Sequence, residues 1–276
     1  MECINFDARF EAFAGEWMHQ NADRYRNNLD RMEAKMPEVY EQWLHTPMDW
    51  LEGKAPGTYF AAYTDADRLV CWMLSYFVEK VPVPDQLLER ITELGAEAEQ
   101  ALLALLCDEA KPEEARLTAI SMLTEMESQA PLSHYVAWIA EREARDERAE
   151  MAAEALVAMG RVVVAPVLDA LEGATEPGRE TFLDVLCNFP GDPVIYTLAV
   201  DMFHGHPERH ALFASLLGKL GDDRAIPELL GAIEDPSLSY LDYIELRNAI
   251  EALGGDMPVE REFAGDAYYE SLRRME

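Results

Sequence analysis

The sequence predicts an all-α protein and, within that class, an α-α superhelix in which pairs of helices repeat along the chain as a solenoid. Apolar residues recur at three- and four-residue spacing through residues 95–255, which gives each expected helix one apolar stripe. Helix stop signals also return every 30 to 33 residues, near positions 95, 127, 160, 191, 221 and 254. A fixed period of this size is typical of solenoids, because each repeat buries its apolar face against its neighbours.

The composition is that of a folded but strongly acidic chain. Of its 276 residues 49% are hydrophobic, enough for a sizeable core, while 53 acidic residues outnumber 23 basic ones and give a formal net charge of -30. Residues 95–276 hold 36 of the acidic and 14 of the basic residues. Such a field repels phosphate backbones and anionic membranes and favours basic or neutral partners.

Residues 1–94 do not follow the period, and we expect them to form an irregular helical cap over the open apolar end of the repeats. Residues 6–45 predict one or two long amphipathic helices, and the Pro- and Gly-rich stretch 47–64 predicts a loop. An apolar helix should begin at Asp65 or Asp67. At the other end, residues 256–276 predict a C-terminal capping helix.

Residues 95–255 divide into five helix pairs. Pro112, Pro177 and Pro207 are placed to open second helices, where a missing amide proton costs little, and Asp192 and Asp222 are placed to cap first helices. Arginines recur at intervals of 30 to 32 residues early in the second helices, and we expect them to pair with acids of adjacent turns. They are Arg116, Arg148, Arg179 and Arg209.

The stretch "DDRAIPELLGAIEDP" (222–236), followed by "ELRNAIEALGG" (245–255), resembles the HEAT-like repeat of the phycobilisome-lyase type. In that family an acidic turn starts the first helix, a proline bends it, and the second helix ends in Ala-Leu-Gly. Pro227 and Pro166 match the family's proline. The resemblance is strongest over 222–255, weaker over 161–191 and degenerate over 95–160. It implies a stacked helix-pair fold, because such repeats serve many activities.

The function that the pattern favours is a non-catalytic protein-interaction scaffold in the cytoplasm, with no cofactor. Second helices line the inner wall of such a superhelix, and their acidic concave face would bind a basic or neutral protein or peptide, and neither nucleic acid nor membrane. The expected polar positions of this wall are Arg116, Glu150, Glu180, Asp184, His210 and Glu245.

Two enzymatic or nucleic-acid alternatives follow from the resemblance. A bilin-lyase-like enzyme, or another enzyme built on HEAT-like repeats, would need a groove for its substrate, and nothing in the sequence specifies one. HEAT-like DNA glycosylases need a basic inner wall, whereas residues 95–276 carry a net charge of -22. Nucleotide-binding, serine-hydrolase and zinc-protease motifs are absent from the sequence, which favours a protein that is not an enzyme.

Two clusters of side chains are weaker candidates for sites. Trp50, Tyr59 and Phe60 belong to a stretch dense in aromatic residues, which predicts either an aromatic pocket or the packed core of the cap. His204, His206 and His210 lie within seven residues and are weak candidates for metal ligands. A solvated turn explains these histidines better, and we predict no metal site.

Four cysteines lie far apart, and none forms a C-x-x-C pair. Cys71, Cys107 and Cys187 stand among apolar helical residues, which predicts buried, reduced thiols of a cytosolic protein. The N-terminus lacks the basic and apolar regions of a signal peptide, and no segment approaches the length of apolar sequence that a transmembrane helix needs.

Overall fold

The computed structural model describes residues 2–25, 28–143, 146–256 and 261–274, and this part of the chain is all-α. It contains sixteen α-helices and six short 3-10 helices; its one piece of β pairing is an isolated bridge between Met48 and Lys54. The chain divides into two compact units, Met1–Pro131 and Leu132–Glu276, which we call unit 1 and unit 2. The predicted helical class is therefore confirmed.

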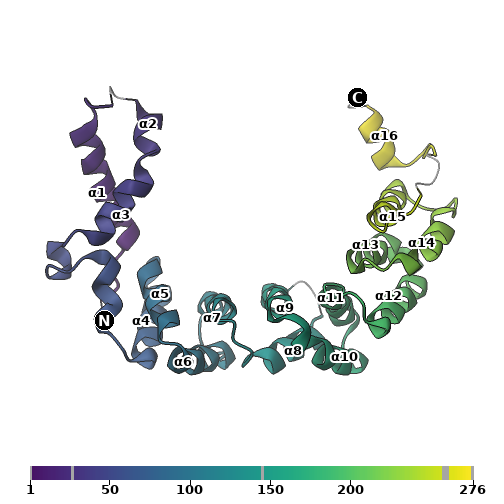
Figure 1. Cartoon of the computed structure of the whole chain (residues 1–276), viewed down its shortest axis with the longest axis horizontal. Coiled ribbons are helices and arrows are strands. Elements are labelled where there is room, and N and C mark those ends of the chain that lie inside the picture. Colours follow the sequence, from purple (N-terminus) through teal and green to yellow (C-terminus); the bar gives the residue numbers. More distant parts are fainter. Residues whose placement is uncertain (1, 26–27, 144–145, 257–260, 275–276) are drawn as a thin grey trace. The chain divides into compact units, whose positions relative to one another are not determined.

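The beginning of unit 1 is a series of short helices joined by turns (Figure 1). It consists of α1 (Phe6–Asn21), α2 (Leu29–Glu33), α3 (Met36–His45), η1 (Asp49–Leu51) and η2 (Pro56–Ala62). Helix α3 packs against both α1 and η2. The prediction of a loop over 47–64 was wrong in this respect, because Pro56 starts a seven-residue 3-10 helix that buries Phe60.

The rest of unit 1 contains α4 (Ala66–Glu79), α5 (Asp85–Glu93), α6 (Ala96–Cys107) and α7 (Glu113–Glu125). Asp65 caps α4 by accepting a hydrogen bond from the Arg68 amide at 2.9 Å. Helices α6 and α7 form a pair, and α4 and α5 pack together and against that pair. Pairwise packing of helices thus begins before residue 95 and continues through unit 1.

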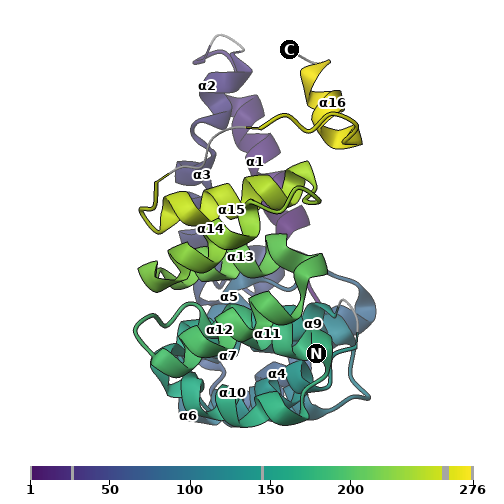
Figure 2. The same ribbon diagram turned by 90° about the vertical axis from the view of Figure 1, so that its right-hand side faces the viewer.

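Unit 2 contains nine α-helices in its described residues: α8 (Leu132–Ala140), α9 (Glu147–Met159), α10 (Val164–Ala170), α11 (Glu176–Leu186), α12 (Pro193–Gly205), α13 (His210–Leu220), α14 (Ile226–Ile233), α15 (Tyr240–Ala252) and α16 (Ala267–Arg273). Successive helices pack as pairs, and α11 contacts both helices of the pair before it. Figure 2 shows α12 to α15 following one another. This packing is compatible with a solenoid. The predicted C-terminal helix is α16, and residues 257–260 lie outside the described residues.

The predicted helix stops coincide with left-handed backbone. Positive φ angles occur at Gly95, Glu127, Gly160, Gly191, Gly221 and Gly254, at steps of 32, 33, 31, 30 and 33 residues. After α7, Ser128 donates its amide proton to the Leu123 carbonyl, and Glu127 donates to Thr124, both at 3.0 Å. Gly255 and Gly254 make the same two bonds after α15. This is the Schellman arrangement of a helix end, so Glu127 stands where the other ends have glycine.

The predicted capping of two helix starts by aspartate is also confirmed. Asp192 caps α12 and Asp222 caps the 3-10 turn η6 (Asp223–Ala225), each by accepting a backbone amide proton. Pro227 lies in the first turn of α14, directly after η6, and Pro166 lies in the first turn of α10 after η3 (Gly160–Val163). The helix therefore changes from 3-10 to α near each proline, where a missing amide proton is tolerated.

The periodic arginines use two kinds of partner. Arg148 and Arg209 contact acids, Asp146 and Glu180 respectively, as predicted. Arg116 instead donates from Nε to the Leu106 carbonyl at 3.0 Å, and Arg179 donates from Nε to the Leu171 carbonyl at 3.1 Å. Both carbonyls lie at the end of the first helix of the same pair, where intrahelical partners run out, and the Leu171 carbonyl also accepts the Ala174 amide proton. Arg116 and Arg179 thus join the two helices of one pair, whereas Arg209 joins neighbouring pairs.

The prediction of buried thiols was correct for one cysteine of three. All four cysteines are free; Cys187 is buried, whereas Cys71 and Cys107 are exposed. Cys71 stands between buried Val70 and buried Trp72. Neighbouring positions of a helix point in different directions, so apolar neighbours in the sequence do not determine the face on which a residue lies.

One helical run of the described residues, Glu147–Gly173, is long and apolar enough to cross a membrane by length and composition alone. No such segment is expected from the sequence. The run joins two predicted helices, α9 and α10, through Gly160, which has a φ of +77°. Because α9 ends at this residue, the run is not one uninterrupted α-helix, and buried residues of both helices belong to the core of unit 2.

Candidate functional site

A groove of about 990 Å³ lies in unit 2 along three successive second helices, α9, α11 and α13. Its size is at the upper end of the range of ligand sites in proteins. Each helix contributes residues three, four and seven positions apart, which is the spacing of one helical face. We define the apolar floor of the groove as Ala153, Val157, Val185, Leu212 and Leu216.

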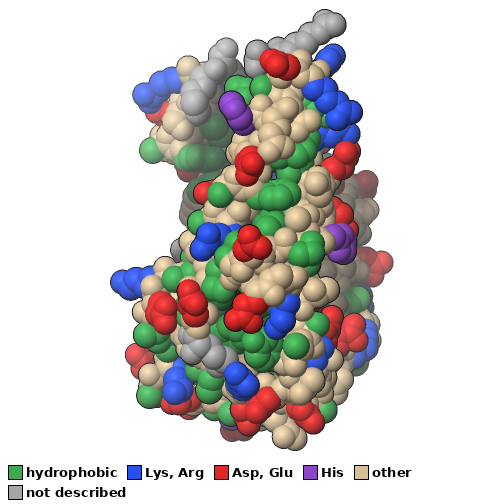
Figure 3. Space-filling model, turned by 90° about the vertical axis from the view of Figure 1, so that its left-hand side faces the viewer, with side chains coloured by type: hydrophobic (Ala, Val, Ile, Leu, Met, Phe, Trp, Pro, Cys, Tyr) green, Lys and Arg blue, Asp and Glu red, His purple; other side chains and the backbone are tan. Residues whose placement is uncertain are grey.

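The charged side chains of the groove are nearly balanced. Four carboxylates line it, from Glu150, Glu154, Glu180 and Asp184, together with three cations, from Arg142, Arg209 and Lys219. The acidity of the chain is thus not concentrated here. On the face that Figure 3 draws, acidic side chains are likewise dispersed among basic and apolar ones and form no single block.

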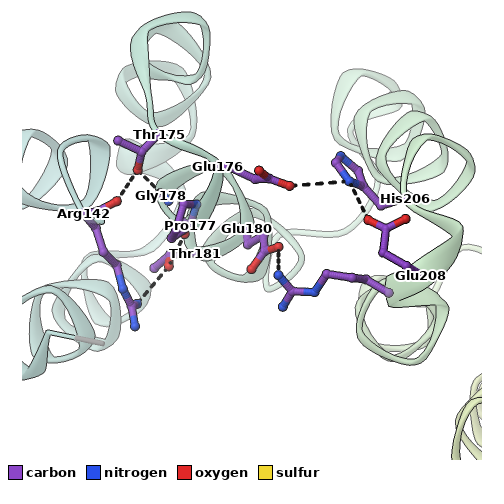
Figure 4. A network of polar contacts seen from close by, with 10 residues as sticks. Arg142, Thr175, Glu176, Pro177, Gly178, Glu180, Thr181, His206 and Glu208 are labelled. Carbon is purple, nitrogen blue, oxygen red and sulfur yellow. Dashed lines mark hydrogen bonds and ion pairs between the residues drawn. The ribbon is translucent and has the colours of Figure 1, made fainter. Parts of the chain in front are cut away.

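At one end of the groove a polar network holds Arg142, which is 14% exposed (Figure 4). Its guanidinium donates to the Thr181 hydroxyl at 3.0 Å and to the Glu150 carboxylate at 3.2 Å. The Arg142 carbonyl accepts a hydrogen bond from the Thr175 hydroxyl, which also caps α11 at the Gly178 amide. The start of α11 is therefore tied to the loop that follows α8.

Two ion pairs cross from α11 to the helix pair that follows it. Glu180 contacts Arg209, and Asp184 contacts Lys219 at 2.7 Å. Lys219 also donates to the Asp184 carbonyl at 3.3 Å. Buried Cys187 belongs to the same helix end. Burial raises the pKa of its thiol to about 12, while Lys219 lowers that pKa and Asp184 raises it by smaller amounts. The seam between α11 and α13 is thus bridged by charged side chains.

The six predicted wall residues fall into two groups. Glu150, Glu180 and Asp184 line the groove together. Arg116 belongs to unit 1 and binds the Leu106 carbonyl, and His210 stacks on Phe203 with ring centroids 4.7 Å apart. Glu245 is half-buried on α15, outside the groove lining.

The three histidines do not converge. The His204 Nε2 atom is 2.9 Å from Glu228 Oε2, while His206 Nδ1 is 3.3 Å from Glu208 and 3.6 Å from Glu176. The pKa of Glu208 is lowered, first by a hydrogen bond from its own backbone N–H and further by His206. Within the described ranges no group of three or more His, Cys, Asp or Glu residues is placed to hold a metal ion.

The aromatic residues of the predicted pocket pack around Phe6. The Phe6 ring centroid lies 5.5 Å from Trp50, 5.7 Å from Phe60 and 6.2 Å from Tyr59. Phe60 is buried, and Trp50 and Tyr59 are half-buried. The side chain of Phe6, from the start of α1, therefore occupies the space among these three rings, which makes them part of the core of unit 1.

Sequence reasoning missed the basic side chains Arg142 and Lys219 and the apolar floor. A signal for the ion pairs exists: acids at positions 180 and 184 face cations 29 and 35 residues later, on either side of the repeat length. Residues separated by about one repeat occupy equivalent places in neighbouring pairs, so opposite charges at that distance predict a bridge. Arg142 gives no such signal, because its place depends on the loop after α8.

No protein-family model, no curated protein and no solved structure matches this chain, so its family is not identified and it is, at present, an all-helical protein of sixteen described α-helices.

Proposed function

We propose that the helix pairs stack as HEAT-like repeats and that the groove along α9, α11 and α13 binds a segment of another protein without catalysing a reaction. The observation that carries this proposal is the composition of the groove. Apolar side chains of three successive second helices line it together with seven charged side chains, which we call its rim. Protein-binding surfaces commonly have this anatomy, because apolar contact supplies affinity and the polar rim supplies specificity.

The acids and bases of the rim favour binding over catalysis. Arg142, Arg209 and Lys219 each contact a carboxylate, so these cations are already engaged within the protein. General acid–base catalysis needs a group whose pKa is tuned in a pocket. A partner segment therefore gains most from apolar side chains that reach the floor, and its charge should be neutral or basic because the chain is acidic.

The test compares two substitutions of the same kind. Peptides are selected from a random display library on the full chain, and their affinity is measured by fluorescence anisotropy. Val157→Arg places a charge in the groove, whereas Val162→Arg places it at a valine that is 47% exposed on η3, outside the groove lining. We expect Val157→Arg to weaken binding about tenfold or more and Val162→Arg to leave it unchanged.

Circular dichroism checks that both variants remain folded. Ser215→Arg, at an exposed residue of α13 that lines the groove, provides a second blocking variant if Val157→Arg reduces stability. Selected peptides whose affinity is the same for wild type, Val157→Arg and Ser215→Arg would refute the groove as the binding surface.

A further inference from the structure

Acidic residues of α11 form a ladder along the seam with the next helix pair. Glu176, Glu180 and Asp184 are four residues apart, so they share one face of the helix. Each faces a basic group from the next pair: His206 at 3.6 Å, then Arg209, then Lys219 at 2.7 Å. Figure 4 shows Glu176 directed toward His206 and Glu180 engaged in its own ion pair. We call Glu176, Glu180 and Asp184 the acidic ladder.

The seam that the ladder bridges differs from the next one along unit 2. Helix α13 packs closely along α15, where a Cβ atom on Gly218 would lie 3.1 Å from the Ala249 Cα atom. Between α11 and α13, by contrast, direct backbone contact is slight, and long charged side chains span the gap. Side chains of this kind can exchange one partner for another without a change in helix packing.

The two ion pairs of the ladder differ in exposure. Lys219 and Asp184 are 38% and 53% exposed, whereas Arg209 is 43% exposed and its partner Glu180 only 15%. Exposed ion pairs contribute little to stability, because water solvates the separated charges nearly as well. A cation from a partner could therefore replace Lys219 at a small cost, and the exposed Arg209 side chain could move aside for a cation that reaches Glu180.

The groove also has one carboxylate in surplus. Of its four acids, Glu150, Glu180 and Asp184 contact cations of the groove, whereas Glu154 is exposed and has no ion-pair partner among the described residues. The long-range field of a chain with net charge -30 attracts cations to it. Charge complementarity thus favours a basic segment over an acidic one.

We infer, resting on the proposed function, that the groove takes a basic amphipathic helix. Its apolar face lies on the floor residues Val157, Leu212 and Leu216, and its Lys or Arg side chains bind Glu154 and displace Arg209 and Lys219 from Glu180 and Asp184. Binding of an amphipathic helix in a groove uses apolar anchors at three- and four-residue spacing, which match a floor made by three helices. In the absence of the partner, Arg209 and Lys219 pair with the acids that the partner's cations would bind.

The experiment uses three 14-residue peptides. All have leucines at the same helical spacing, and the remaining positions are all lysine, all glutamine or all glutamate. The full chain is compared with the variant Arg209→Gln/Lys219→Gln, which removes two cations that face the acidic ladder and is called the ladder variant. The matched control is Lys35→Gln/Arg224→Gln, which also removes one lysine and one arginine; both are paired with carboxylates outside the groove, Glu38 and Asp222. Fluorescence anisotropy measures the dissociation constants.

We expect the lysine peptide to bind most tightly. The ladder variant should tighten its binding about three- to tenfold relative to the control variant, the range for the release of two ion pairs with exposed cations, and should leave the affinity of the glutamine peptide unchanged. Equal tightening in both double variants overturns the inference, because it would reflect net charge alone. So does tighter binding of the glutamate peptide, or weaker binding of the lysine peptide by the ladder variant.

The same measurement separates failure of the inference from failure of the proposed function. If the glutamine peptide binds as well as the lysine peptide, and Val157→Arg abolishes both, the groove binds peptides and only the inference is wrong. If no peptide binds, or if Val157→Arg and Ser215→Arg affect none of them, the proposed function fails and the inference fails with it.

Discussion

At Gly178 the backbone of α11 approaches the end of α8 so closely that a side chain has no room. A Cβ atom there would lie 2.4 Å from the Ile139 carbonyl oxygen, which no flexible side chain can relieve. Gly231, in the interior of α14, faces open space instead. The sequence cannot distinguish these two glycines, because both stand inside helical patterns and their surroundings come from other helices.

The two positions predict opposite effects of one substitution. Gly178→Ala should lower the free energy of unfolding by about 1–3 kcal/mol, since a backbone atom must move. Gly231→Ala should raise it by about 0.5–1 kcal/mol, since alanine favours the helix. Urea denaturation measures both, and a stabilising Gly178→Ala would contradict the close approach of α8 and α11.

At the scale of the element, helix ends were more predictable than the segments between them. Asp65, Asp192 and Asp222 cap the expected helices because an acidic side chain before an apolar stripe has a local reason to accept amide protons. The expected one or two helices of residues 6–45 are three, since Asn28 caps α2 and α3 begins near Pro37. The left-handed residue after α7 is Glu127, where composition alone gives no glycine signal.

Glu127 therefore carries a conformational strain that glycine would not. Glu127→Gly should raise the free energy of unfolding by up to about 1 kcal/mol, because the φ of +54° is unfavourable for a residue with a Cβ atom. Glu125→Gly, at the last residue of the same helix, should lower it by up to about 1 kcal/mol. Thermal melts of the two variants compare them directly, and destabilisation by both would contradict the left-handed assignment.

At the scale of the whole molecule, the charge of -30 is the dominant electrostatic feature. The composition could predict the effect of this charge on solubility and on the choice of partner. It could not predict that positive and negative charges nearly cancel in the groove, because the positions of Arg142 and Lys219 depend on tertiary structure. Glu150, Glu180 and Asp184 could be predicted, since they occupy repeating positions on second helices. Arg116, His210 and Glu245 occupy similar positions in sequence and lie elsewhere.

Self-repulsion of these acids predicts the response to salt. Raising the NaCl concentration from about 0.02 M to about 0.2 M should raise the melting temperature by roughly 2–4 °C, because screening relieves repulsion more than it weakens the exposed ion pairs. Differential scanning calorimetry at fixed pH makes the measurement. A melting temperature that falls with salt would mean that attractive pairs outweigh the net charge.

The contrast between the two seams of unit 2 has a mechanical consequence. Helices α13 and α15 pack closely along each other, whereas α11 and α13 have little direct backbone contact; two ion pairs bridge them, and α12 packs against both. Under tension, the ionic seam would yield first, and the groove would widen while the helices on both sides stay intact. The seam between α11 and α13 would then be the part of unit 2 that opens most easily under force, and the same seam lines the proposed binding groove.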